Sequence, residues 1–109
     1  MLTISVVTPC YNEEVNIWEC YRAVKEIFDK ELPQYAREHV FCDNASTDKT
    51  VAILREIAAA DPAVKVILNA RNFGPLRSNF NGVMAATGDA VLLFDSEDDR
   101  VSPTILDGV

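Results

Sequence analysis

The stretch Leu2-Thr-Ile-Ser-Val-Val-Thr8 is a run of β-branched and apolar residues that Pro9 closes. Such a short run is typical of a strand buried on both faces, as in a parallel sheet. Three further short apolar runs follow along the chain, at 39–43, 64–68 and 90–94. We therefore expect four buried strands.

Between these runs, apolar residues recur at the spacing of helices, in segments at 17–28, 51–58 and 76–84. Asn12 is placed to cap the first helix, and Ser46 or Thr47 the second, because side-chain oxygens accept backbone N–H groups at helix starts. Beyond the fourth strand, Pro103 leads into a short tail that can be helical. The alternation of strands and helices predicts an α/β fold, with a parallel, Rossmann-like sheet and flanking helices.

Composition excludes several classes of protein. The chain has 109 residues, enough for one domain, with 49% hydrophobic and 25% charged residues, so we do not expect intrinsic disorder. Its formal net charge of −7 argues against a binder of nucleic acid or of anionic membranes, since both favour a basic face. No apolar run approaches the ~20 residues that cross a bilayer.

The cysteines and the start of the chain indicate the compartment. Cys10, Cys20 and Cys42 form no CxxC pair, and with His39 as the one histidine the spacings of zinc sites are absent. The first residues show neither a basic region nor a small-residue cleavage site. We therefore expect a reduced, cytoplasmic protein with structural cysteines.

Ligands of parallel sheets bind beyond the carboxyl ends of the strands, which selects the loops at 8–14, 43–50, 69–74 and 95–99. The last of these holds four carboxylates in five positions, directly after a buried strand: Asp95, Glu97, Asp98 and Asp99. Clustered carboxylates repel one another unless a cation lies among them, and oxygen ligands suit Mg²⁺ or Mn²⁺. Such an ion commonly bridges to a substrate diphosphate.

The other loops carry further candidates. Asp43 ends the second strand, where its carboxylate can accept hydrogen bonds from the N–H edge of a nucleobase. Asp48 is either a capping acid of the second helix or a second functional carboxylate. Arg71 and Arg77 flank a Gly-Pro turn, and they are either phosphate ligands or surface arginines.

Four segments in order resemble the family 2 glycosyltransferases of GT-A fold. They are Val6-Val-Thr-Pro-Cys-Tyr-Asn-Glu-Glu14, Cys42-Asp-Asn-Ala-Ser-Thr-Asp-Lys-Thr50, Asn69-Ala-Arg-Asn-Phe-Gly74 and Ala86-Thr-Gly-Asp-Ala-Val-Leu-Leu-Phe-Asp95. Asp-Asn-Ala-Ser-Thr-Asp and Arg-Asn-Phe-Gly, followed by Arg77-Ser78, are the most specific parts. Within the family, the chain is most similar to the polyprenyl-phosphate (bactoprenol or dolichol phosphate) glycosyltransferases.

The resemblance implies roles for individual residues. The nucleotide pocket would be lined by Thr8, Pro9, Tyr11 and Glu13. Asp43 would read the base, uracil, with Asn44 and Ser46 shaping its loop and Arg71 close to the phosphates. Asp95 and Glu97 match the family's Asp-x-Asp metal motif by ungapped spacing. The second acid of that motif is normally Asp, and a shift of one residue would make Asp98 the ligand instead of Glu97.

The resemblance also implies a reaction. A sugar would pass from a nucleotide-diphosphate sugar, UDP-linked, to a polyprenyl phosphate or glycan acceptor with the help of Mg²⁺ or Mn²⁺. Residues 1–109 would be the donor-binding half of the enzyme, truncated at its C-terminal end. The catalytic base and any membrane contact would then lie in downstream segments. The full-length enzyme would act at the cytoplasmic face of a membrane. We expect such a half to form homo-oligomers or to aggregate, because the missing half would cover apolar helix faces.

Two other functions remain open. One is a catalytically inactive nucleotide-binding module. The other is a nucleotidyltransferase, against which the absence of a Gly-rich phosphate loop after the first strand counts.

Overall fold

The computed structural model describes residues 1–70, 83–95 and 100–105, and it describes the side chains of 1–70 and 83–94. Along the chain, the elements are β1 (Thr3–Cys10), α1 (Ile17–Lys30), β2 (Ala36–Asp43), α2 (Thr50–Ala60), β3 (Val64–Leu68), β4 (Ala90–Asp95) and β5 (Arg100–Ile105). Residues 83–85 add one helical turn before β4. The rest of the third predicted helix lies outside the described residues.

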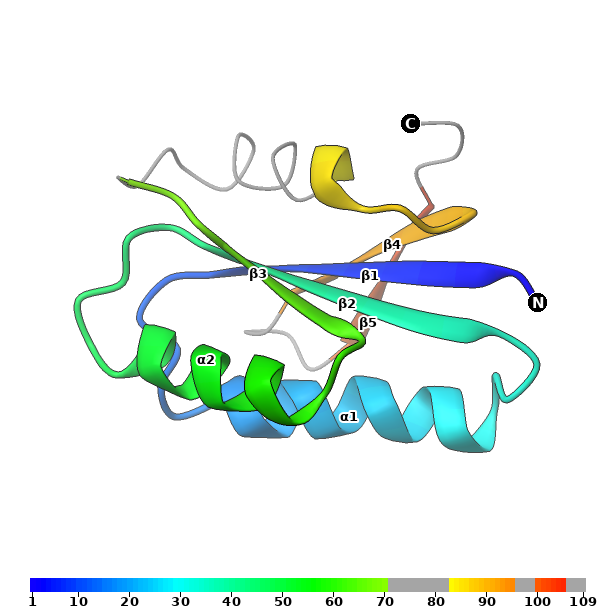
Figure 1. Cartoon of the computed structure of the whole chain (residues 1–109), viewed down its shortest axis with the longest axis horizontal. Helices are drawn as coiled ribbons and strands as arrows, with labels where there is room; N and C mark the ends of the chain where they lie inside the picture. The colour runs from blue at the N-terminus through cyan, green and yellow to red at the C-terminus, as the bar shows by residue number, and fades with distance from the viewer. Residues whose placement is uncertain (71–82, 96–99, 106–109) are drawn as a thin grey trace.

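The strands form one sheet in the order β3-β2-β1-β4-β5. The first four strands are parallel, with β1 paired to both β2 and β4, and β2 paired to β3. The predicted α/β fold with a parallel sheet and flanking helices is therefore confirmed. The carboxyl ends of β1, β2, β3 and β4 all point to one edge of the sheet (Figure 1).

A fifth strand that the sequence did not predict follows β4, and it takes in Thr104 and Ile105, the first two residues of the tail expected after Pro103; the rest of that tail lies outside the described residues. Residues Arg100–Ile105 form β5, which runs antiparallel to β4 and pairs Asp95 with Arg100. Pro103 lies inside this strand. A proline lacks a backbone N–H, and a strand at the edge of a sheet tolerates this because only one of its sides is paired.

Helices α1 and α2 cover one face of the sheet, and the turn at 83–85 lies on the opposite face (Figure 1). Successive strand residues point to opposite faces. Val6 packs on the helical side with Phe41 and Phe94, whereas Val7 packs on the other side with Val40 and Val91. Because β1 is buried on both faces, its sequence reads as the continuous apolar run that predicted it.

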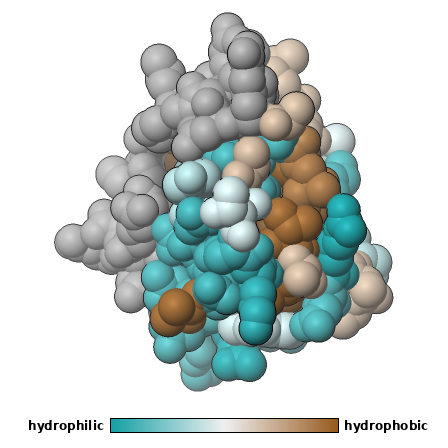
Figure 2. Space-filling model, turned by 90° about the vertical axis from the view of Figure 1, so that its left-hand side faces the viewer, coloured by the Kyte–Doolittle hydropathy of each residue, from teal (hydrophilic) through white to brown (hydrophobic). Residues whose placement is uncertain are grey.

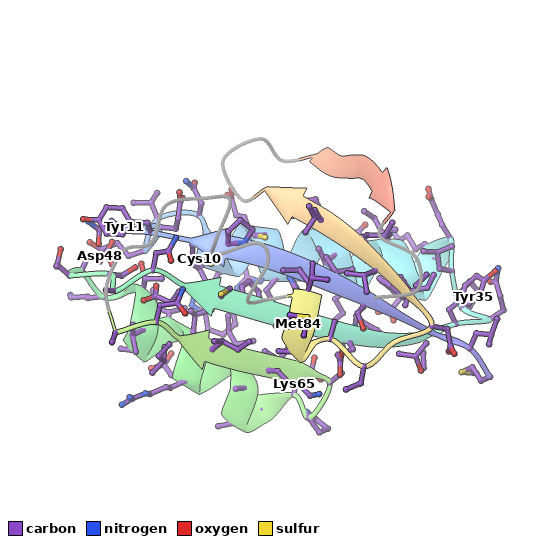
Figure 3. All side chains as sticks on the ribbon, turned by 90° about the horizontal axis from the view of Figure 1, so that it is seen from above. Cys10, Tyr11, Tyr35, Asp48, Lys65 and Met84 are labelled. Carbon is purple, nitrogen blue, oxygen red and sulfur yellow. The ribbon has the colours of Figure 1, made fainter. Side chains whose placement is uncertain are left out.

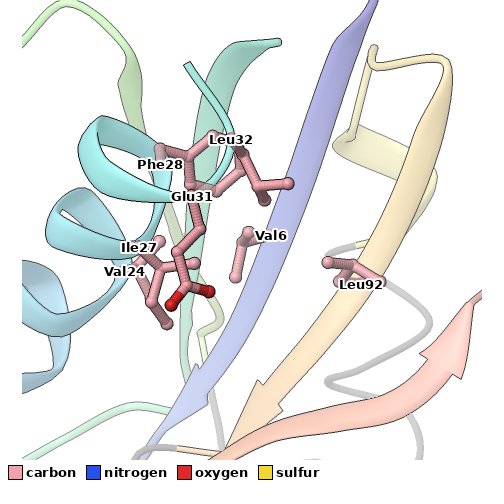
Figure 4. Close-up of a pocket in the computed structure, with 7 residues that line it drawn as sticks. All are labelled: Val6, Val24, Ile27, Phe28, Glu31, Leu32 and Leu92. Carbon is pink, nitrogen blue, oxygen red and sulfur yellow. The ribbon is translucent and has the colours of Figure 1, made fainter. Parts of the chain in front are cut away.

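Part of the helical side is not filled. An apolar cavity of about 270 Å³ lies between α1 and the strands β1 and β4 (Figure 4). Its lining residues are mostly apolar: Val6, Val24, Ile27, Phe28, Glu31, Leu32 and Leu92. Neither α1 nor α2, the helices with assigned bounds, is long and apolar enough to cross a membrane.

Both predicted helix caps are wrong. Helix α1 begins after Asn16 rather than at Asn12, and the side chain of Asn16 makes no capping bond. Helix α2 begins at Thr50, and its N–H is accepted by Oδ1 of Asp48 at 2.9 Å. The side chain of Asn12 instead accepts a backbone N–H of the loop after β2.

A buried polar network fixes the other end of the sheet. The carboxylate of Glu38 accepts hydrogen bonds from the hydroxyl of Ser5 at 2.7 Å and from the hydroxyl of Thr87 at 2.7 Å, and it pairs with Lys65. The N–H of Gly88 donates to the Ser5 hydroxyl at 2.8 Å. A Cβ at position 88 would lie 2.4 Å from that oxygen, so only glycine fits there. The chain therefore enters β4 at a fixed register against β1.

Candidate functional site

The loops that follow β1, β2 and β3 meet at the carboxyl edge of the sheet. The carbonyl of Cys10 accepts the N–H of Asn44 at 2.9 Å, and the carbonyl of Asp43 accepts the N–H of Asn69 at 2.9 Å. These bonds continue the parallel pairing beyond the strands. Tyr11 and Asp48 lie together at this end of the molecule, whereas Tyr35 lies at the opposite end (Figure 3).

Asp43 is a buried acid of this edge, and hydrogen bonds hold both of its carboxylate oxygens. Its Oδ2 accepts the backbone N–H of Ser46 at 2.9 Å, and its Oδ1 accepts the hydroxyl of Ser46. The residue is only 1% exposed, so its carboxylate has a fixed direction before any ligand arrives. Each carboxylate oxygen has two lone pairs, and the two bonds from Ser46 leave acceptor capacity for an N–H of a ligand.

The loops after β1 and β2 are joined through Asn12. Its backbone N–H donates to the hydroxyl oxygen of Ser46 at 2.9 Å. Its Oδ1 accepts the N–H of Thr47 at 2.8 Å and that of Asp48 at 3.4 Å. The side chain that was predicted to cap α1 therefore satisfies backbone donors of a loop more than thirty positions away in sequence.

Two residues of these loops have a left-handed backbone. Asn12 has φ of 51° and Ala45 has φ of 63°, and within the described ranges they are the two non-glycine residues with positive φ. Asparagine tolerates this region better than most residues, whereas alanine adopts it at a cost. Strained backbone of this kind persists where surrounding contacts fix it, and it is frequent at ligand sites.

Asp48 and Glu13 complete the junction. The N–H of Glu13 donates to the hydroxyl of Thr50 at 2.8 Å, and the N–H of Glu14 donates to Oδ2 of Asp48 at 3.3 Å. Burial raises the pKa of Asp48, but the hydrogen bonds from Thr50 and Glu14 together lower it by more. The pKa of Asp48 therefore lies below its ordinary value. Asp48 therefore has the capping role that was one of its two predicted readings.

The residues predicted to line a nucleotide pocket differ in exposure. Tyr11 is 46% exposed at the edge, Pro9 is half-buried next to it, and Glu13 is buried with 7% exposure. Thr8 is fully buried, and its hydroxyl lies 2.8 Å from Nε2 of His39. Its strand position directs its side chain toward the core beneath the helices, and the place of Thr8 in a nucleotide pocket stays a prediction.

His39 is fully buried and has a structural role. Its ring stacks on Phe41 with centroids 3.9 Å apart. Burial, together with the positive charge of Arg37, lowers the pKa of His39 to about 3, so its imidazole is neutral at physiological pH. It has no exposed surface through which to act on a ligand.

Asn44 and Asn69 close the edge on the β3 side. Asn44 is 5% exposed, and its Oδ1 accepts Nδ2 of Asn69 at 2.8 Å. The sequence analysis did not single out Asn12, Asn69 or Thr50 as site residues. A usable signal was present, because each is a hydrogen-bonding residue in or beside a loop that follows a parallel strand.

The predicted metal site is only partly within the described residues. Asp95 ends β4. Leu93, two positions earlier, pairs with Val7 of the parallel strand β1, so the backbone of Asp95 lies level with that of Pro9 at the same edge. The side chain of Asp95 lies outside the described part, as do Glu97, Asp98 and Asp99, and the arginines Arg71 and Arg77. Among the described side chains, no three His, Cys, Asp or Glu residues form a group that could hold a metal ion.

The surface of this end is largely hydrophilic where it is described, with an apolar strip beside the polar area (Figure 2). Leu68, at the end of the edge strand β3, is 45% exposed, and Val15 is 83% exposed. Among its described residues, the edge offers fixed polar groups and the exposed aromatic ring of Tyr11. Such a surface can bind a small polar ligand that carries a flat ring.

Curated proteins with similar sequences are glycosyltransferases by name. An uncharacterized glycosyltransferase, YkcC of Bacillus subtilis strain 168, is 39% identical over 93 residues, which are 85% of this chain and 28% of that protein. A prophage bactoprenol glucosyl transferase homolog of Escherichia coli strain K12 is 39% identical over 94 residues, 86% of this chain and 30% of that protein. The chain thus spans less than a third of the length of these relatives.

Solved structures share the fold. S. aureus TarS 1-349 in complex with UDP-GlcNAc superposes with a TM-score of 0.75 at 29% identity, over 88% of this chain and 27% of that one. The mannosyltransferase PcManGT of Pyrobaculum calidifontis, in complex with GDP-Man and Mn²⁺, gives a TM-score of 0.74 at 27% identity, over 94% of this chain and 29% of that one.

The family profile described as "Glycosyl transferase family 2" matches residues 5–106, almost the whole chain. This match agrees with the parallel sheet, with the loops gathered at its carboxyl edge, and with the relatives in sequence and structure. The chain belongs to glycosyl transferase family 2.

Proposed function

We propose that this chain is the donor-binding part of a glycosyltransferase that uses a UDP-linked sugar. The observation that carries the proposal is the Asp43 carboxylate, which Ser46 holds in one direction at the carboxyl edge of a family 2 sheet. The complex of the similar TarS with UDP-GlcNAc supports a uridine donor.

In this proposal Asp43 accepts the N3–H of uracil. Uracil presents a donor at N3, whereas cytosine presents a lone pair there, so a carboxylate at this position favours UDP over CDP. Tyr11, which is 46% exposed, offers its ring to the base, with Pro9 and Glu13 beside it. Asn44 and Ser46 keep the loop in shape, and Arg71 pairs with the phosphates.

A divalent cation completes the proposed donor site. Asp95, with Glu97 or Asp98, would hold Mg²⁺ or Mn²⁺, because an all-oxygen ligand set suits these ions. Such an ion neutralises the charge that develops on the departing nucleoside diphosphate. The complex of PcManGT with GDP-Man and Mn²⁺ supports this assignment.

The acceptor is proposed to be a polyprenyl phosphate, as the name of the E. coli relative suggests, or else a glycan. An acceptor oxygen would attack the anomeric carbon of the sugar while the bond to the diphosphate breaks. We assign the base that takes the acceptor's proton to none of the described residues. The donor site would face the cytoplasm, where nucleotide sugars are made.

Titration calorimetry of the chain with UDP, with and without Mn²⁺, tests the proposal. We expect UDP to bind in the presence of Mn²⁺ and binding to weaken when EDTA removes the metal. No heat with UDP under either condition would contradict the donor-binding function. Binding without sugar transfer, when a longer protein that contains this chain is given a radiolabelled UDP-sugar and acceptor lipid, would favour the inactive binding module instead.

A further inference from the structure

We propose that Asn12 is a positioning residue for the nucleotide donor: it locks the loop at 44–49 and thereby fixes the direction of the Asp43 carboxylate. The inference rests on the proposed function and adds to it a residue that touches neither the base nor the metal. It is carried by the hydrogen bonds of Asn12 and by the backbone of the two loops that these bonds join.

Asn12 binds the loop at two places. Its side-chain Oδ1 accepts the N–H of Thr47 at 2.8 Å, with Asp48 N–H at 3.4 Å. Its main-chain N–H donates to the Ser46 hydroxyl oxygen at 2.9 Å. One residue of the β1–α1 loop therefore holds three consecutive positions of the β2–α2 loop.

Ser46 passes this restraint on to Asp43. A hydroxyl has one hydrogen to donate, and the bond accepted from Asn12 leaves that hydrogen for Oδ1 of Asp43. The backbone N–H of Ser46 binds Oδ2 at 2.9 Å. If the loop moves at Thr47, the two donors of Ser46 move with it, and the carboxylate loses its fixed direction.

The backbone indicates that this loop needs an external restraint. Ala45 lies directly between Asn44 and Ser46 with φ of 63°, a conformation that an alanine does not choose by itself. Asn12, on the facing loop, is left-handed too, with φ of 51°. Residues held in such regions persist where the surroundings over-determine them, which is common at ligand clamps.

Asn12 is exposed and belongs to neither core cluster. Its side chain therefore adds little to the packing of the sheet and helices. Since an exposed loop residue can be changed without loss of the core, its effect on nucleotide binding can be separated from an effect on folding.

The test compares Asn12→Gly with Asn12→Asp. Glycine keeps the left-handed backbone and the N–H that reaches Ser46, but it removes the acceptor for Thr47. Aspartate keeps that acceptor and tolerates the same backbone. Asn12→Ser, whose side chain is one bond shorter than that of asparagine, takes the place of Asn12→Gly if that variant does not fold. Lys30→Ala, which removes an exposed ion pair with Glu26, is the control far from the site.

Dissociation constants for UDP and CDP in Mn²⁺ are measured by calorimetry, with thermal unfolding followed in parallel. We expect Asn12→Gly to weaken UDP binding by about 5- to 20-fold, because only a fraction of the molecules hold the competent loop. CDP binding, which does not use the carboxylate in the same way, should weaken less. The preference of the protein for UDP over CDP therefore falls. Asn12→Asp and Lys30→Ala should keep that preference.

An unchanged UDP affinity in Asn12→Gly would overturn the inference, as would an equal loss of UDP and CDP binding, since a merely structural role predicts the latter. If the wild-type chain binds UDP but Asn12 variants behave in this way, the proposed function stands and the inference alone is wrong. If the wild type binds neither nucleotide, the proposed function itself is wrong and the inference falls with it.

Discussion

Ser46 binds both carboxylate oxygens of Asp43: its hydroxyl donates to Oδ1, and its backbone N–H donates to Oδ2 at 2.9 Å. The same hydroxyl oxygen accepts the N–H of Asn12. One serine thus joins the carboxyl end of β2 to the loop after β1.

Replacing Ser46 by alanine removes two hydrogen bonds at once. We expect Ser46→Ala to lower the free energy of unfolding by about 1–2 kcal/mol, since each bond contributes roughly 1 kcal/mol. UDP affinity should fall several-fold as well, because Oδ1 of Asp43 loses its partner. Urea unfolding and calorimetry measure the two effects. Ser46→Thr keeps the hydroxyl and serves as the control, and equal UDP affinities in the two variants would count against the role of this bond.

Ala45 can be replaced by glycine to test the backbone conformation. At φ of 63°, alanine is strained by about 1–2 kcal/mol, whereas the greater freedom of glycine in the unfolded chain costs only about 0.4–1 kcal/mol. Ala45→Gly should therefore stabilise the protein by a few tenths of a kcal/mol or more. Ala52→Gly, at an exposed position within α2, should destabilise it by about 1 kcal/mol. Similar losses in both variants would show that residue 45 is not left-handed.

His39 predicts how stability depends on pH. Its pKa is lowered to about 3 in the folded protein, mainly by burial, against an ordinary value of 6.5. The unfolded chain therefore takes up a proton first, so stability is complete above pH 6.5 and falls as the pH drops from there toward 3. Between pH 7 and pH 5.5 we expect a loss of about 1 kcal/mol.

The carboxyl of Glu38 titrates below this window. Burial raises the pKa of Glu38, but hydrogen bonds from Lys65, Thr87 and Ser5 lower it to about 2, so this carboxyl affects stability below its ordinary value of 4.5. His39 is the one histidine of the chain. In His39→Gln, which keeps a partner for Thr8, the slope of stability against pH between 7 and 5.5 should disappear in urea titrations. A slope that persists would assign it to another group.

The apolar cavity beside α1 predicts self-association. Ile27, Leu32 and Leu92 line a space of about 270 Å³ on the helical side of β1 and β4, and apolar surface of this kind favours association. We expect light scattering of the isolated chain to show dimers or larger species, as the sequence analysis predicted. Ile27→Glu should shift the distribution toward monomer, and a wild type that is wholly monomeric at micromolar concentration would contradict the prediction.

Apolar patterning predicted the strands well where they are buried on both faces, but it missed polar strand residues. Strand β2 begins at Ala36 rather than at His39, because Arg37 and Glu38 look like loop residues in sequence. Inside the fold each has a distant partner: Arg37 pairs with Asp61 at 2.6 Å, and Glu38 accepts the hydroxyl of Ser5. Pairings of this kind are made by the tertiary structure, so local sequence does not reveal them.

The candidate site was predicted to a similar extent. Loop chemistry and family resemblance placed Asp43, Ser46 and Tyr11 at the carboxyl edge, and the structure brings their segments together there. Local sequence did not reveal the contact between the buried hydroxyl of Thr8 and Nε2 of His39, because the fold brings the two strands together. The sequence analysis also gave Asn12 to the helix that follows it, whereas the donors that Asn12 satisfies lie on another loop.

The central claim, that the Asp43 carboxylate reads the base of a uridine donor, is tested most directly by calorimetry of UDP and CDP with the wild type and with Asp43→Asn in Mn²⁺. The wild type should prefer UDP by about tenfold or more, since CDP lacks the N3–H that a carboxylate accepts. In Asp43→Asn an amide N–H can face N3 of cytosine, and the preference should disappear. Equal affinities of the wild type for UDP and CDP, or a preference that Asp43→Asn leaves intact, would contradict the account.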